Sequence, residues 1–253
     1  MADNPNPPSR KSPPLLLVGL ALVGAAIAAY FALRSPEPTA QPAPPPVAKE
    51  EPTQPADAPL PPPEQRDTSV RGQLSDVSPA LGQYLGQRDL LERWVQIANN
   101  LAEDRSPREP LSFLPPPARF TAAGGKIDER SYSRYNWFGQ IVASVDARKF
   151  AAAVQTLRPI LTTAYHTLGY PKGNIDDLAR KSLGRLVRAP LVEGPIEVVQ
   201  SGAVYKFKDS HLESLGAVEK HLLRMGPQNE KIVQQKASEI LEALGLQSTA
   251  KQP

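Results

Sequence analysis

The sequence predicts a mainly α-helical protein with a single N-terminal transmembrane helix, a disordered proline-rich linker, and one helical globular domain that carries a small β-hairpin. Three observations support this fold class. Residues 15–33 are an uncharged apolar run, 12 of the 29 prolines lie between residues 35 and 66, and apolar residues recur at helical spacing after residue 90. The expected order is a cytoplasmic tail (1–14), the transmembrane helix (15–33), the linker (34–75), the domain (76–246) and a disordered tail (247–253).

The apolar run is long enough to cross a membrane. Its 19 residues, at about 1.5 Å per residue, make a helix about 28 Å long, close to the thickness of the hydrocarbon core of a bilayer. A cleaved secretory signal is the alternative, with Ala26-Ile27-Ala28 as its cleavage site, but the run stays apolar through Leu33. We therefore expect a retained anchor whose partner is the lipid bilayer.

The charges that flank the anchor predict its orientation. Arg10 and Lys11 precede it, whereas only Arg34 follows it closely, and positive charge is enriched on the cytoplasmic side of membrane helices. The sequence thus predicts a single-pass protein whose C-terminal domain is exported. Small residues at every fourth position of the anchor would allow weak self-association, although alanine as a common filler is the simpler explanation.

The linker is expected to act as a stiff spacer. Residues 35–66 contain the strings PAPPP and PLPPP and no glycine, a composition that cannot bury apolar surface and favours extended polyproline II structure. Fully extended, this tract would reach about 100 Å and would hold the domain away from the membrane. A peptide ligand for a polyproline-reading module is the alternative interpretation.

Helical periodicity and capping residues predict the elements of the domain in order. Ser78, followed by Pro79, is expected to cap a first turn. Asp146, Asn174 and Asp209 are expected to cap later helices. Apolar stripes predict helices over residues 90–101, 132–145, 147–168 (kinked at Pro159), 175–187 and 227–244, and a further helix that ends at Gly226.

Two segments depart from this helical pattern. Residues 105–126 hold five prolines and a Gly-Gly pair, so they predict an irregular excursion, pinned to the core by Phe113, Leu114 and Phe120. Residues 196–200 and 203–207 are rich in β-branched and aromatic side chains. The Ser201-Gly202 pair between them predicts the turn of a hairpin.

Four strings in the domain resemble a known bacterial family. They are RYNWF at 134–138, LGYPKGN at 168–174, EGPIEVVQ at 193–200 and LLRMGPQN at 222–229. With the anchor and the proline tract, the chain resembles a membrane-anchored family classed only as a domain of unknown function. The resemblance implies a bacterial inner-membrane protein with a periplasmic domain, and it implies no activity. Asn136 and Trp137 stand where the family pattern has an acidic residue and a proline.

The sequence contains no recognisable catalytic motif. There is no cysteine, which excludes thiolate zinc sites, disulfides and cysteine nucleophiles. His166, His211 and His221 show no helical zinc-site spacing, and the GxSxG, HExxH and phosphate-loop motifs are missing. We therefore predict no catalytic, cofactor-binding or metal-binding residues. The net charge of +3 is too small and too dispersed to predict a nucleic-acid partner.

One basic group and one tryptophan are the candidate partner-binding residues. The basic group could bind an anionic glycan, lipid headgroup or phosphate, and it consists of Lys172, Arg180, Lys181, Arg185 and Arg188. A solvated helix face is the simpler explanation of that group. Among the aromatic residues at 132–138, Trp137 is the best candidate for a surface contact, because its neighbours share a core-facing stripe.

The expected function is therefore that of a non-enzymatic, membrane-tethered envelope protein. Its exported helical domain would bind an envelope protein or an anionic polymer. The alternative is an envelope hydrolase or glycan-processing enzyme whose active site is dispersed in the sequence. A pocket with two or more ionisable groups of perturbed pKa would favour the enzyme.

Overall fold

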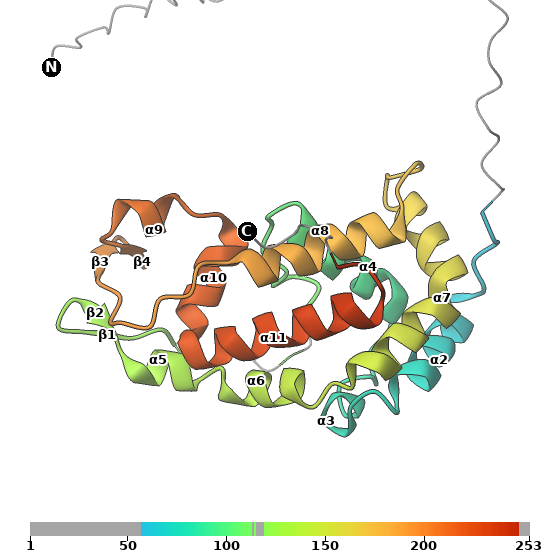
Figure 1. Cartoon of the computed structure of the whole chain (residues 1–253), viewed down its shortest axis with the longest axis horizontal. Coiled ribbons are helices and arrows are strands. Elements are labelled where there is room, and N and C mark those ends of the chain that lie inside the picture. Colours follow the sequence, from blue (N-terminus) through green and yellow to red (C-terminus); the bar gives the residue numbers. More distant parts are fainter. Residues whose placement is uncertain (1–56, 113, 115–118, 248–253) are drawn as a thin grey trace, which may run out of the picture. The chain divides into compact units, whose positions relative to one another are not determined.

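The computed structural model describes residues 57–112, 114 and 119–247 (Figure 1). The expected transmembrane helix at 15–33 and most of the linker lie outside these residues. Within the described residues, no helix combines the length and the apolar character that crossing a bilayer requires.

The described residues are mainly helical, as predicted. The helices are α2 (Pro63–Leu74), α3 (Pro79–Gly82), α4 (Leu90–Ala102), α5 (Glu129–Ser133), α6 (Asn136–Ala143), α7 (Ala147–Thr167), α8 (Ile175–Arg188), α9 (Ser210–Ser214), α10 (Ala217–Met225) and α11 (Pro227–Ala243). Helix α11 packs against α6, α7, α8 and α10, and α4 packs against α2, α7 and α8 (Figure 1). Two antiparallel hairpins complete the fold, β1 (Ala122–Ala123) with β2 (Lys126–Ile127), and β3 (Val198–Ser201) with β4 (Val204–Phe207).

The core of the described residues consists of three apolar clusters. The largest joins α2, α4, α7 and α8 and includes Leu91, Val95 and Leu161. A second cluster lies beneath the β3–β4 hairpin and α10. The third joins α10 and α11 to the end of α8. The longer helices therefore each bury one face, which matches the helical spacing of apolar residues in the sequence, whereas α3 and α9 have no buried residue.

The predicted linker boundary at residue 75 is wrong, because α2 belongs to the folded domain. Val70 is 1% exposed and lies with Leu74 in the largest core cluster. The carboxylate of Asp67 accepts hydrogen bonds from the backbone N–H of Asp89 at 3.0 Å and of Leu90 at 2.8 Å. Asp89 has a φ of 57° and makes no cap with its own side chain. Asp67 therefore caps α4 from a distant helix, which fixes α2 in place.

The predicted caps are confirmed. The side chains of Ser78, Asp146, Asn174 and Asp209 each accept a hydrogen bond from a backbone N–H of the following turn. The helix expected over residues 132–145 is divided, since α5 ends at Ser133 and α6 begins at Asn136. Pro159 lies inside α7, which continues to Thr167.

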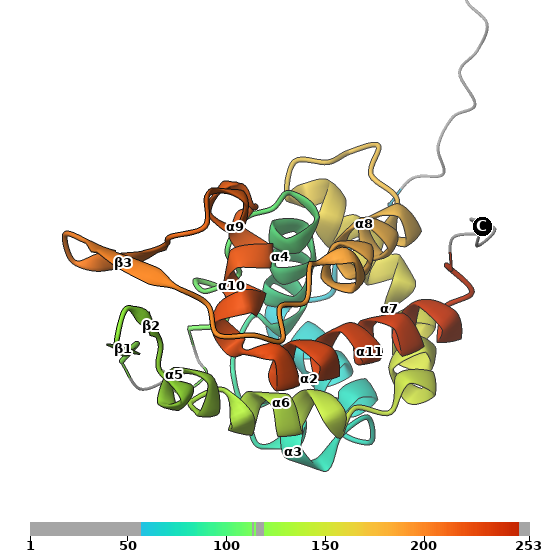
Figure 2. The ribbon, with the colours of Figure 1, turned by 60° about the vertical axis from the view of Figure 1, so that its left-hand side comes forward.

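The predicted β-hairpin is confirmed, and its outer edge is covered. Ser201 pairs with Val204 across the turn, where Gly202 has a φ of 62°. On the free edge of β4, Glu213 accepts from the N–H of Phe207 at 2.9 Å, and Arg224 donates to the carbonyl of Tyr205 at 3.3 Å. Figure 2 shows the hairpin standing out beyond the helices. These two side chains occupy edge groups that could otherwise pair with another chain.

The irregular excursion over residues 105–126 contains a second, shorter hairpin. The Gly124-Gly125 pair makes its turn, with φ values of 58° and 73°. Phe120 packs in the cluster beneath the β3–β4 hairpin, as expected. Phe113 lies outside the described residues.

Candidate functional site

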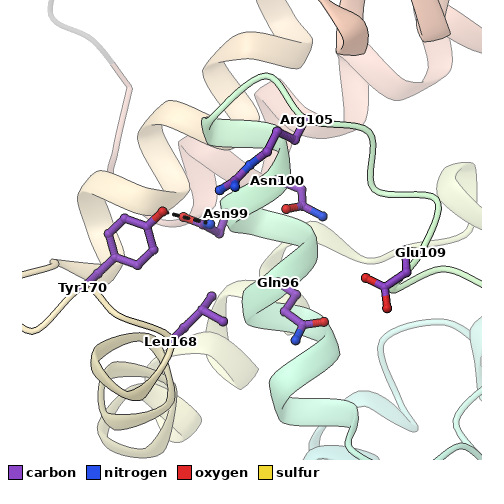
Figure 3. A pocket seen from close by; sticks show the side chains of 7 residues that line it. All are labelled: Gln96, Asn99, Asn100, Arg105, Glu109, Leu168 and Tyr170. Carbon is purple, nitrogen blue, oxygen red and sulfur yellow. Dashed lines mark hydrogen bonds between the residues drawn. The ribbon is translucent and has the colours of Figure 1, made fainter. Parts of the chain in front are cut away.

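A polar recess opens beside the C-terminal half of α4 (Figure 3). Its volume is about 280 Å³. It is lined by Gln96, Asn99, Asn100, Arg105, Glu109, Leu168 and Tyr170. The wall thus presents three carboxamides, one guanidinium, one carboxylate and one phenol hydroxyl. These groups offer both donors and acceptors to a polar ligand.

Asn99 is the buried polar group of this recess. Its side chain is 4% exposed, and its Nδ2 donates to the hydroxyl of Tyr170 at 3.3 Å. Within the described residues its Oδ1 has no hydrogen-bond partner. An unpaired buried acceptor costs about 1–3 kcal/mol. A donor from a ligand or a water molecule that reached Asn99 would offset this cost.

The loop that carries Tyr170 is held rigidly against α7. The rings of Tyr165 and Tyr170 stack with centroids 4.8 Å apart and an interplanar angle of 16°. Gly169 has a φ of 109°, which a side chain would strain. A Cβ at Gly173 would collide with the Tyr165 ring. These contacts fix the Tyr170 hydroxyl over α4, where Asn99 meets it.

A smaller apolar hollow adjoins the recess. It has a volume of about 120 Å³ and is lined by Leu60, Glu92, Val95, Gln96, Ala164, Thr167 and Leu168. Gln96 and Leu168 line both spaces. The two together form a groove along α4 with a polar end and an apolar end. We call the smaller space the apolar annex.

Arg185 forms an ion-pair network within the domain. Its guanidinium lies 3.0 Å from Glu219 and 3.7 Å from Asp104, and it donates to the carbonyl of Ala102 at 3.4 Å. Asp104 also accepts from the N–H of Val218 at 3.0 Å. Arg185 therefore connects α8 with the end of α4 and the start of α10, which is a structural role.

The other members of the predicted basic group lie on the surface of α8 and the preceding loop. Arg180 pairs with Asp177 on its own helix. Lys172, Lys181 and Arg188 are exposed. The structure therefore does not gather the five residues around one concave site, and none of them lines the recess. Their role in binding a partner stays a prediction.

Trp137 is half-buried in an aromatic group. Its ring centroid lies 6.2 Å from that of Tyr84 and 5.9 Å from that of Phe138. The indole therefore packs between α6 and the segment after α3, and only part of its surface is open to a partner.

Two titratable groups in the described part of the chain have a strongly shifted pKa, and both lie away from the recess. Burial raises the pKa of Glu230 to about 7. Burial, with the nearby charges of Arg108, Arg224 and Arg134, lowers the pKa of His221 to about 4. Neither residue lines the recess or the annex. Within the described residues there is also no cluster of three histidine or acidic side chains that could hold a metal ion.

Sequence reasoning missed the residues of the recess. Asn99 continues the buried row of Leu91 and Val95 on α4, and Gln96 and Asn100 lie beside it on the same helix. The sequence alone does not distinguish such a set of carboxamides from ordinary polar residues of a helix. Tyr170 belongs to the string LGYPKGN, which carried the family resemblance. That string was the one available signal, because the recess forms only when α4 meets the loop after α7.

Fold and site together define a small helical domain with a polar groove on one face. Residues 90–241 match a family described as "Protein of unknown function (DUF3014)", and the match covers more than half of the chain. The chain therefore belongs to this family, as the resemblance indicated. No curated protein and no solved structure matches the chain.

Proposed function

We propose that the chain is a membrane-tethered cell-envelope protein that binds a partner, without catalysis, through the groove along α4. The observation that carries the proposal is the buried carboxamide of Asn99, whose Oδ1 is unpaired within the described residues beside the Tyr170 hydroxyl. The apolar run at 15–33 and the basic residues before it support the tether. The family match implies no activity.

The chemistry of the groove favours an extended segment of a partner protein. Gln96, Asn99 and Asn100 present carboxamides, which can donate to and accept from a peptide backbone at once. The adjoining annex has apolar walls from Leu60 and Val95 and would take an apolar side chain of the same segment. A peptide therefore matches both ends of the groove, whereas a glycan would leave the annex without a complementary group.

The alternative function, a hydrolase or glycan-processing enzyme, has less support. General acid–base catalysis needs titratable groups of shifted pKa within reach of the substrate. The two groups with strongly shifted pKa, Glu230 and His221, line neither part of the groove. The surroundings of these residues therefore favour structural roles.

Selection from a random peptide display library tests the proposal. The target is the full chain in lipid nanodiscs, and a glycan array is run in parallel. We expect enrichment of peptides with an apolar residue next to a polar stretch. Asn99→Leu should weaken the selected peptides about 10-fold, because a buried hydrogen-bonding group is worth about 1–2 kcal/mol. Arg105→Ala, at an exposed position, provides a second variant that leaves the core intact.

Gln140→Leu is the matched control, because Gln140 is an exposed carboxamide on α6, outside the groove. The proposal is supported if Asn99→Leu and Arg105→Ala weaken binding while Gln140→Leu does not. Equal affinity of all three variants would contradict it. Enrichment confined to the glycan array would contradict the peptide class and favour a polymer ligand.

A further inference from the structure

The first described residues of the chain run as a short strap over α7. We call residues 57–62 the strap. The carboxylate of Asp57 lies 2.8 Å from Nδ1 of His166, and Thr163 donates to the carbonyl of Ala58 at 2.8 Å. Leu60 packs against the largest core cluster and forms one wall of the apolar annex. The strap is thus fastened to α7 at its start and covers apolar surface further along.

The other end of the strap is held by α2. The guanidinium of Arg66 donates to the carbonyl of Pro61 at 3.0 Å and forms an ion pair with Glu92 on α4. Helix α2 begins at Pro63 and is anchored in the core by Val70 and Leu74. The Pro61 end therefore stays with the domain, and the Asp57 end is the one that can separate.

Whether the Asp57 end of the strap stays attached to α7 depends on the charge of His166. Its Nδ1 faces the Asp57 carboxylate, and its Nε2 lies 2.9 Å from the carbonyl oxygen of Gly173. Both partners are acceptors only, so both ring nitrogens must donate. A neutral imidazole has one N–H and would lose one of the two hydrogen bonds. Both hydrogen bonds therefore form together only when the ring is doubly protonated and cationic.

We infer that the strap is a pH-dependent clasp, which His166 holds closed while protonated and releases when it loses its proton, opening the apolar annex. This inference does not rest on the proposed function. Opening would expose the side of the apolar annex that Leu60 covers.

The direction of the pH dependence follows from the partners of His166. The Asp57 carboxylate, and then the Gly173 carbonyl, raise the pKa of His166 above its ordinary value of 6.5. The raised pKa stabilises the closed strap below pH 6.5, and this stabilisation is lost as the pH rises through the folded-state pKa. Asp57 is the charged side chain in contact with the ring. Lys172 stands in the loop next to Gly173, and Arg66 and Glu92 lie at the opposite end of the strap.

Two measurements on the full chain in nanodiscs test the clasp. The first is an NMR titration of its three histidines, with His166 assigned by substitution. The second is an electron-spin distance measurement. Because the chain has no cysteine, spin labels can be placed at Pro59→Cys on the strap and Ala152→Cys on α7, both at exposed positions. We expect one narrow distance at about pH 6 and a longer, broader distribution at about pH 9, because His166 loses its proton as the pH rises.

Asp57→Ala is the test variant, because it removes the carboxylate that accepts from Nδ1 of His166 and puts no hydrogen-bonding group in its place. We expect it to return the His166 pKa toward about 6.5 and to broaden the distance distribution already at about pH 6. His211→Gln, on the exposed surface of α9, is the matched control and should leave both readouts unchanged. A distance distribution that is the same at both pH values would overturn the inference. So would an Asp57→Ala variant that stays closed.

Discussion

Glu230 shows how one side chain can set the pH dependence of stability. It lies in the first turn of α11 and is 1% exposed, and within the described residues its Oε1 has no partner. Burial raises its pKa from 4.5 to about 7. Between these values the folded chain holds a proton that the unfolded chain releases, so stability falls as the pH rises through this window.

Glu230→Gln should remove this loss, because the amide carries no charge to bury. We expect a gain on the order of 1–3 kcal/mol in the free energy of unfolding at about pH 8 and little change at about pH 4. Urea unfolding at the two pH values measures it. Glu242→Gln, at an exposed position of the same helix, is the control. If the free energy of unfolding of the variant falls with rising pH as steeply as that of the parent chain, Glu230 is not the group responsible.

At the residue scale, the sequence predicted local roles well and distant partners poorly. Asp146 and Asn174 were identified as caps because their partners follow within three residues. Arg185 was assigned to a basic surface because its partners, Asp104 and Glu219, are contributed by other parts of the chain. The buried Asn99 was missed for the same reason, since Tyr170 reaches it only in the folded domain.

Helix α2 is the element that sequence reasoning assigned incorrectly. Its composition is polar and it follows a proline-rich tract, so it resembles the linker. Tertiary contacts make it part of the domain. Val70 and Leu74 are buried in the core, and Asp67 accepts two hydrogen bonds from the start of α4. Periodicity identified the longer helices because each carries a full apolar stripe. Helix α2 gives no comparable signal, because Val70 and Leu74 are the buried apolar residues among its 12.

Asp67→Ala should therefore destabilise the whole domain. It leaves two backbone N–H groups at the start of α4 without their acceptor, a loss of about 2 kcal/mol. Thermal unfolding monitored by circular dichroism measures the effect. Asp76→Ala, at an exposed aspartate beyond α2, is the control and should be neutral. If both variants unfold at the parent temperature, α2 is not an integral part of the domain.

At the scale of the whole molecule, the proposed function joins an anchored N-terminus to an exported domain. The anchor is inferred from the apolar run at 15–33, and the export from the basic residues before it. The proposed role of the groove along α4 depends on this arrangement, since a tethered domain meets only partners on its own side of the membrane.

The cysteine-free chain allows one direct measurement of this arrangement. Gln228→Cys places a single thiol on the exposed start of α11. Cells that express this variant are treated with a membrane-impermeant maleimide after the outer permeability barrier is opened, and their membranes are then washed at alkaline pH. The account predicts that the thiol is labelled without lysis of the inner membrane and that the labelled chain stays in the washed membrane pellet. Labelling only after lysis, or release of the labelled chain into the wash, would contradict it.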